Sequence, residues 1–221
     1  MSGAHLLNDL QALLARINDA TVPLVVSDFH LAERWRCAAL LGRALSEDED
    51  EKLLLEEGAK ESALSVYIDE RVLERLRRCD PMQQLDDENL ADFCAAMEGV
   101  SHFHYLIWCV THGRQLSLLE LELQAEVDKY SVAVCLLRQQ GSTDLPRGLR
   151  RRLFDQVRFV DGHSAATRQR YQEANRHAAC FCERLELRYF GRRRFQPEAW
   201  LRTLREFYRR PHHQKMRFAL Q

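Results

Sequence analysis

The chain has 221 residues, of which 46% are hydrophobic and 29% are charged, and its formal net charge is −1. These values exclude a chain that is disordered throughout, and the low content of nine glycines and five prolines excludes collagen-like and linker-like classes. A chain of this length can bury enough surface to fold as one domain, or as two small ones, without disulfides or a metal.

The first residues and the cysteines indicate a protein of the cytoplasm. The N-terminus lacks the basic segment and the unbroken apolar core of a secretory signal, since Asn8, Asp9 and Arg16 interrupt the leucines. The most apolar stretch, residues 100–110, contains two histidines and is shorter than the roughly 20 residues of a membrane span. Seven cysteines without any C-x-x-C spacing are typical of reduced thiols. We therefore expect a cytoplasmic protein without a membrane span.

Charge is divided unevenly along the chain. Residues 1–130 carry 12 Lys and Arg against 25 Asp and Glu, whereas residues 131–221 carry 20 against 8. Arg accounts for 28 of the 32 cationic residues, a bias typical of a GC-rich bacterial genome. Two interpretations stay open: the two parts pack together and neutralise each other, or the basic part forms a face for an acidic partner.

Residues 1–85 predict a small α+β region, in which apolar residues recur at helical spacing or alternate as they do in strands. A turn around Gly58 joins two of the strands as a hairpin, and the last helix ends near Pro81. We expect the strands to form a small antiparallel sheet. The expected elements are helix 4–18, strand 24–30, helix 33–44, strands 52–57 and 63–69, and a helix from residue 70.

Residues 86–221 predict a helical body with a basic C-terminal segment, continuous with the first region or separate from it. The short turn at Gly113 makes the first two helices an antiparallel hairpin at the centre of the fold. The tail from Arg209 onward is expected to be poorly ordered. The fold class is therefore α+β and predominantly α-helical. The expected helices cover residues 90–112, 117–140, 149–160, 164–190 and 196–208.

One stripe of the helix over residues 90–112 carries side chains that hydrogen-bond, titrate or bind metals. A solvent-facing helix would carry Lys, Arg and Glu there, so we expect this stripe to face protein or a cleft. Gly99 beside the stripe indicates close approach of another backbone. The members of the stripe are Cys94, Glu98, Ser101, His102, Tyr105, Cys109 and His112.

The next helix starts with a capping box, in which Ser117 is the N-cap and Glu120 reaches back to its backbone amide. Two polar stripes then separate two apolar faces, so that one set of charges is expected to be partly buried. At a rise of about 1.5 Å per residue, His102 lies level with Glu126, and Glu98 lies level with Lys129. The two polar stripes are Glu122, Glu126 and Lys129, and Gln124, Asp128, Ser131 and Cys135.

The carboxylates and histidines of three helices suggest a site, for which three interpretations stay open. They form an ion-pair network that fixes helix packing, or a metal-free cleft in which His102 is the general base and Glu126 orients it. In the third interpretation they bind a metal, with oxygen and nitrogen donors that suit Fe, Mn or Zn. The pattern by itself requires no cofactor, and Lys129 would compete with a cation. The candidate metal ligands are Glu98, His102, Glu122, Glu126, Glu173 and His177.

Aromatic and arginine residues alternate in the C-terminal segment, a pattern that suits stacking and phosphate contact. The sequence therefore favours an intracellular binding or regulatory protein that contacts an acidic protein or a nucleic acid through this segment. The alternative is an enzyme built on the Glu and His residues above. No spacing in the sequence specifies an oligomeric state. The expected partner-binding residues are Arg192, Arg193, Arg194, Arg209, Arg210 and Lys215.

Overall fold

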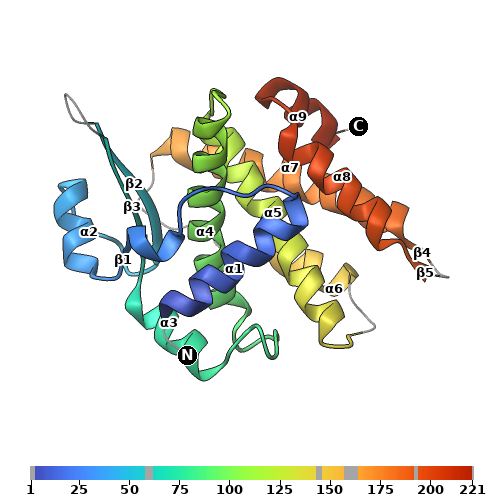
Figure 1. Cartoon of the computed structure of the whole chain (residues 1–221), viewed down its shortest axis with the longest axis horizontal. Helices are drawn as coiled ribbons and strands as arrows, with labels where there is room; N and C mark the ends of the chain where they lie inside the picture. Colours follow the sequence, from blue (N-terminus) through green and yellow to red (C-terminus); the bar gives the residue numbers. More distant parts are fainter. Residues whose placement is uncertain (1–2, 58–61, 143–145, 157–163, 192–193, 221) are drawn as a thin grey trace.

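The computed structural model describes residues 3–57, 62–142, 146–156, 164–191 and 194–220 and shows a mostly helical α+β fold, as predicted (Figure 1). The N-terminal elements are α1 (Gly3–Asn18), a 3₁₀ turn (Val26–Phe29), β1 (His30–Leu31), α2 (Arg34–Leu41), β2 (Glu51–Glu57), β3 (Ser62–Ile68) and α3 (Glu70–Arg78). The C-terminal elements are α4 (Leu90–Thr111), α5 (Leu118–Gln139), α6 (Pro146–Arg150) with a π turn (Arg151–Asp155), α7 (Ala165–Tyr189), β4 (Phe190–Gly191), β5 (Arg194–Phe195), α8 (Pro197–Arg209) and α9 (His212–Leu220).

The three-stranded sheet has the order β1-β3-β2 and is mixed. β2 and β3 form the predicted antiparallel hairpin, from Glu51 opposite Ile68 onward. The prediction of a wholly antiparallel sheet is wrong for β1, which pairs with β3 in parallel over two residues. The segment before β1 forms a turn because the Gln11 side chain of α1 bonds Leu24 O and Val26 N, each at 2.8 Å. These backbone groups therefore have partners outside any sheet.

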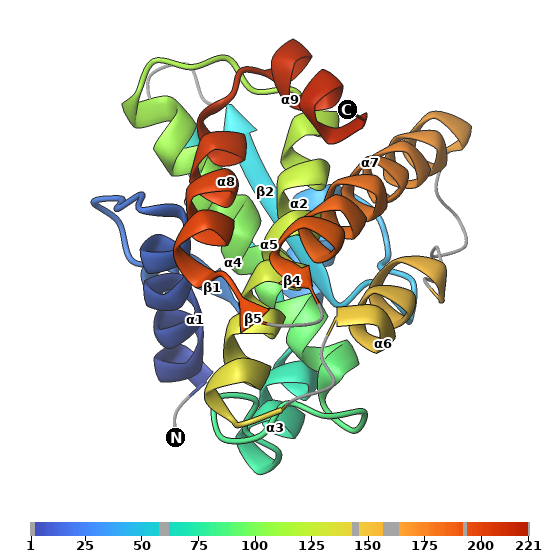
Figure 2. The same cartoon turned by 90° about the vertical axis from the view of Figure 1, so that its right-hand side faces the viewer.

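Helix α5 lies at the centre of the body, where it packs against α4 on one side and α7 on another. Figures 1 and 2 show α1 running beside both α4 and α8, with the sheet on the far side of α4. Contacts of α1 with α8 and of β2 with α4 join residues 1–85 to residues 86–221. Over the described parts of the chain, we find no helix with the length and apolar character that a bilayer crossing needs.

Gly99 allows the sheet to approach α4 closely. A Cβ atom at this position would lie 3.1 Å from Ile68 Cδ1 and 3.1 Å from Glu51 Cγ, so these side chains would have to move by a few tenths of an ångström to make room for it. The close neighbour that the sequence predicts is therefore present, although it consists of side chains from β2 and β3 and not of a backbone. As a result, Glu51 of β2 reaches the polar stripe of α4.

The C-terminal tail differs from its prediction, because it forms α9 and packs against α7 and α8. Lys215 and Ala219 of this helix are fully buried, so the tail is part of the core. The helix expected over residues 149–160 begins earlier, at Pro146, and continues as a π turn to Asp155; residues 157–163 lie outside the described chain. All seven cysteines are free thiols, as predicted.

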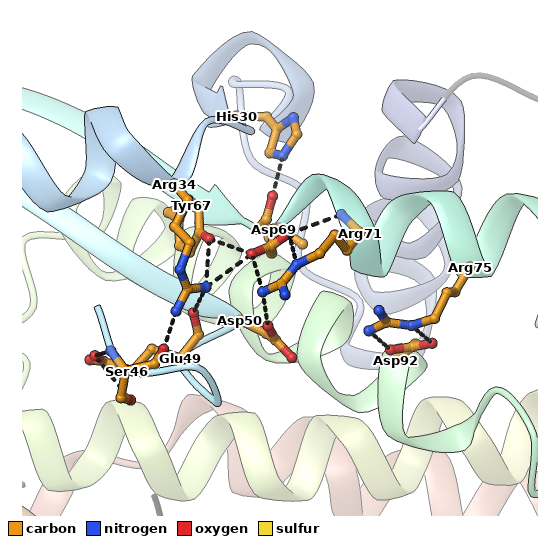
Figure 3. Close-up of polar contacts among 11 residues, drawn as sticks. His30, Arg34, Ser46, Glu49, Asp50, Tyr67, Asp69, Arg71, Arg75 and Asp92 are labelled. Carbon is orange, nitrogen blue, oxygen red and sulfur yellow. Dashed lines mark hydrogen bonds and ion pairs between the residues drawn. The ribbon is translucent and has the colours of Figure 1, made fainter. Parts of the chain in front are cut away.

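Asp69 connects the sheet to α2 and α3 through a dense polar network (Figure 3). Its carboxylate caps α3 by accepting the Arg71 backbone N–H at 2.9 Å, and it also binds the Arg71 side chain. It accepts further hydrogen bonds from Tyr67 Oη at 2.8 Å and from Arg34 at 3.0 Å. Burial by itself raises the pKa of Asp69, but these donors outweigh burial and hold the pKa well below its usual range.

We expect Asp69→Asn to lower the free energy of unfolding by about 3 kcal/mol, because the substitution leaves two guanidinium groups without their shared carboxylate. The matched control is Glu33→Gln, since Glu33 forms a solvent-exposed pair with Arg36. This control should change stability by less than about 0.5 kcal/mol. Urea unfolding measures both values, and equal small losses in the two variants would contradict a stabilising role for the network.

Candidate functional site

Six charged side chains from three elements come together between the sheet and the two central helices. We call this group the carboxylate–histidine array. Its members are Glu51 from β2, Glu98 and His102 from α4, and Glu122, Glu126 and Lys129 from α5. Five of the six are positions that the helical stripes predict, and Glu51 is an addition.

His102 lies between two carboxylates and is only 4% exposed. Its Nδ1 is 3.1 Å from Glu51 Oε1, within hydrogen-bond distance. Its Nε2 is 3.2 Å from Glu122 Oε2, but these two atoms are not aligned for a hydrogen bond. The predicted pairing of His102 with Glu126 is therefore displaced by one helical turn, to Glu122.

The two carboxylates favour the charged form of His102. Burial by itself lowers the pKa of His102, but the attraction of Glu51 and Glu122 outweighs burial and raises the pKa well above its usual value. Burial also raises the pKa of Glu51, against the opposing attraction of His102. The two carboxylates thus favour the protonated imidazole, which is a proton donor, whereas the predicted role of His102 as a general base requires the neutral form.

Lys129 occupies the other end of the array. Its Nζ lies 2.8 Å from Glu98 Oε2 and 2.8 Å from Glu126 Oε1. The prediction that Glu98 and Lys129 lie at the same height along their two helices is therefore confirmed. Burial opposes the charge on Lys129, but these two carboxylates outweigh it and raise the pKa of Lys129 well above its usual value. Arg170 of α7 adds a third cation, with Nε 3.7 Å from Glu122 Oε1.

Three members of the array have the geometry of a metal site. Potential ligand atoms of Glu51, Glu98 and His102 all lie within 4.8 Å of one another, and no other such group of three occurs in the described chain. Sequence reasoning missed Glu51 because it lies in a strand, 47 positions before Glu98. The signal that could have indicated it is Gly99, which marks the point where the hairpin contacts α4.

Glu173 and His177, the remaining predicted metal ligands, do not join the array. They pair with each other along α7, with His177 Nε2 3.7 Å from Glu173 Oε1, and His177 also contacts the backbone of Met216 in α9. Burial lowers the pKa of His177. The prediction that three helices converge on one metal is therefore wrong for α7, because this i,i+4 pair faces α9.

A cavity of about 570 Å³ opens at the Lys129 end of the array. Lys129 and Cys94 line it on one side, and Arg152 with Leu153 on the other. Burial raises the pKa of the Cys94 thiol to about 12, so Cys94 is a poor nucleophile. The volume lies within the usual range of small-molecule sites, and Lys129 is the member of the array that lines the cavity.

A second buried network surrounds Lys215 of α9, which we call the Lys215 network. Lys215 Nζ donates to Tyr105 Oη at 2.6 Å and to Gln124 Oε1 at 2.7 Å, and Tyr105 Oη donates to Glu120 Oε1 at 2.6 Å. Ser117 caps α5 as predicted, but Glu120 turns inward to Tyr105 and Arg114 and does not complete the capping box.

Both polar stripes of α5 are buried, whereas the sequence predicted burial for one set. Asp128 in the second stripe accepts Ser101 Oγ at 2.7 Å and Asn18 Nδ2 at 3.1 Å. Burial raises the pKa of Asp128 to about 6, although these donors lower it. The second stripe is covered because α9 and the end of α1 pack on it.

Several of the predicted partner-binding residues are used inside the chain. Arg209 donates to Asn18 O and Asp19 O at the end of α1, Arg210 pairs with Glu206, and Lys215 is fully buried. An external partner thus has no access to Lys215. Arg192 and Arg193 lie outside the described residues, as does the side chain of Arg194 in β5.

Similarity to known proteins gives no guide to the site. No protein-family model, no curated protein and no solved structure matches this chain. The assignment of a function therefore depends on the geometry of the array and of the surfaces around it.

We expect Lys215 to make the free energy of unfolding rise with pH above about pH 7. Burial lowers its pKa from 10.5 to about 7, although Glu120 and Asp128 raise it. Between these values the unfolded chain binds the extra proton, so the free energy of unfolding rises with pH, by up to about 1.4 kcal/mol per pH unit.

Urea unfolding at pH 7, 8 and 9 measures this slope. Lys215→Met should lose the lysine contribution, whereas Lys52→Met, which removes a half-buried lysine of β2, should retain it. Because other titrating groups contribute to all three proteins, the difference between the slopes isolates Lys215. Equal slopes in wild type and Lys215→Met would contradict the expectation.

Proposed function

We propose that this protein is a metal-dependent enzyme whose centre is the carboxylate–histidine array. The observation that carries the proposal is the convergence of Glu51, Glu98 and His102, with potential ligand atoms within 4.8 Å of one another. The cavity beside Lys129 is large enough for a small-molecule substrate, which would meet the array at Lys129. The Glu and His residues thus have a better claim to function than the C-terminal arginines, several of which bind backbone carbonyls of their own chain.

The donor set defines the class of metal. Two carboxylates and one imidazole suit Fe²⁺, Mn²⁺ or Zn²⁺ and leave coordination positions for water or substrate. Nδ1 of His102 faces Glu51 and is the ligand nitrogen, while Nε2 faces Glu122. A carboxylate on the second nitrogen is the usual way in which proteins orient a metal-binding histidine. Glu122 Oε2 lies 3.2 Å from Nε2, and Glu122 becomes a positioning residue when the two groups align as the metal binds.

The charges of the array also suit a divalent cation. The four carboxylates face three cations, namely Lys129, Arg170 and the protonated His102. A divalent cation that replaces the proton of His102 removes the remaining negative charge. Lys129 holds Glu98 through Oε2, which leaves Oε1 of Glu98 as a second donor.

The chemistry of such a centre is hydrolysis or hydration of a small molecule. A divalent metal lowers the pKa of bound water and polarises a substrate oxygen. In this chain Glu98 and Glu51 would hold the cation, and Lys129, which lines the cavity, is placed to bind a negative group of the substrate. Glu126 holds the Lys129 ammonium in position.

Metal titration of the chelator-treated protein tests the proposal. We expect about one Mn²⁺, Fe²⁺ or Zn²⁺ per chain, counted by elemental analysis after desalting under anaerobic conditions. Glu51→Gln should lose this metal because it removes a ligand, and Glu122→Gln should weaken binding by about 10- to 100-fold because it removes the orienting carboxylate.

Glu173→Gln is the matched control, because Glu173 is a half-buried glutamate that lies outside the array. It should bind metal as the wild type does. The proposal fails if the wild type binds no divalent metal, or if Glu51→Gln retains full affinity. In either case the array is an ion-pair network that fixes the packing of the hairpin on α4.

A further inference from the structure

A second cavity lies between α7, α8 and α9. Its volume is about 480 Å³, within the usual range of small-molecule sites. Its wall is mostly apolar and comes from three helices, with only two cationic side chains. The residues that line it are Phe181, Arg184, Leu185, Leu187, Arg188, Tyr189, Thr203 and Phe218.

Arg184 is the unusual group in this cavity. Its guanidinium donates to Phe218 O, but its Nε is buried and has no hydrogen-bond partner. Among the described residues, no carboxylate lies within ion-pair distance of Arg184, whereas Arg34, Arg114 and Arg150 each have one. A partly buried guanidinium without an anion carries an uncompensated desolvation cost.

The apolar part of the cavity lies next to this charge. The rings of Phe181 and Phe218 lie 5.7 Å and 6.0 Å from the Arg184 guanidinium carbon. Leu187 is 75% exposed, which is high for a leucine and leaves apolar surface open to a ligand. Arg188 lies one helical turn after Arg184, so both cations occur on one face of α7.

We propose that this cavity binds an amphiphilic carboxylic acid, with its carboxylate on Arg184 and Arg188 and its hydrocarbon part on Phe181, Leu185 and Phe218. Arg184 lines the cavity and no carboxylate of the described chain pairs with it, so the exposed part of its guanidinium is placed to donate to the carboxylate of a ligand. The inference is independent of the metal centre, because no residue of this cavity belongs to the array. It assigns an amphiphilic carboxylic acid as the ligand of the arginine and aromatic residues at the end of α7.

Titration calorimetry with octanoate below its micelle concentration tests the proposal, with two comparison ligands. Octyl glucoside has the same chain without the charge, and acetate has the charge without the chain. We expect saturable binding of octanoate, with affinity at least tenfold higher than for either comparison ligand, because both halves of the cavity contribute.

Arg184→Met should weaken octanoate binding by at least tenfold, since a charge-assisted hydrogen bond is lost while the packing of the side-chain methylenes is kept. Leu187→Glu tests the same cavity from its exposed rim, where a substitution does not disturb the core, and should weaken binding through charge repulsion. Arg78→Met, at the exposed end of α3, is the matched control and should bind as the wild type does.

Three results would overturn the proposal. They are no saturable binding of octanoate to the wild type, octanoate binding that Arg184→Met and Leu187→Glu leave unchanged, and equal affinities for octanoate and octyl glucoside. Binding of a poly-glutamate peptide that depends on Arg184, without binding of octanoate, would assign the surface to an acidic polypeptide and also reject the amphiphile. Metal content, measured on the same variants, should not change.

Discussion

Helix α5 buries charged side chains on two of its faces, and the rest of the fold is arranged to give each of them a partner. Glu120, Asp128 and Lys129 are all less than a tenth exposed. An isolated buried charge costs several kcal/mol, so each helix or strand that covers α5 must bring a donor or an opposite charge. The α4 helix brings Ser101 and Glu98, and α9 brings Lys215 to Gln124 and Glu120.

This requirement explains why segments distant in sequence meet at α5. The hairpin of β2 and β3 contributes Glu51 to His102, and the end of α1 contributes Asn18 to Asp128. Arginines of α8 then cover the last carbonyl groups of α1, through Arg205 to Ile17 O at 3.1 Å. The opposite charges of the two halves thus partly meet within the chain, through ion pairs such as Arg170 with Glu122 and through arginine hydrogen bonds to carbonyl groups of α1.

The helices and the inward-facing stripe of α4 could be predicted from sequence, because both depend on periodicity along a single element. Counting residues from the turn placed Glu98 beside Lys129 correctly. It placed His102 beside Glu126, one helical turn away from its actual neighbour Glu122, since helices that cross at an angle do not stay level along their length. Glu51, Lys215 and the inward turn of Glu120 could not be predicted in this way. Each depends on which distant element covers a helix, and local spacing carries no information on that choice.

Access to solvent separates the two buried networks of α5. The Lys215 network contains a fully buried lysine and a fully buried tyrosine, Tyr105, and hydrogen bonds join Lys215 to Tyr105 and Gln124, and Tyr105 to Glu120. Its polar groups therefore hold α9 against α4 and α5, which is a structural role. The array contains more charge and fewer internal hydrogen bonds, and a cavity of about 570 Å³ reaches its Lys129 end. Buried charge lowers the stability of the fold, and here it lies beside a cavity and not inside a fully packed core. Buried charge next to a cavity favours a chemical role for the array over a structural one.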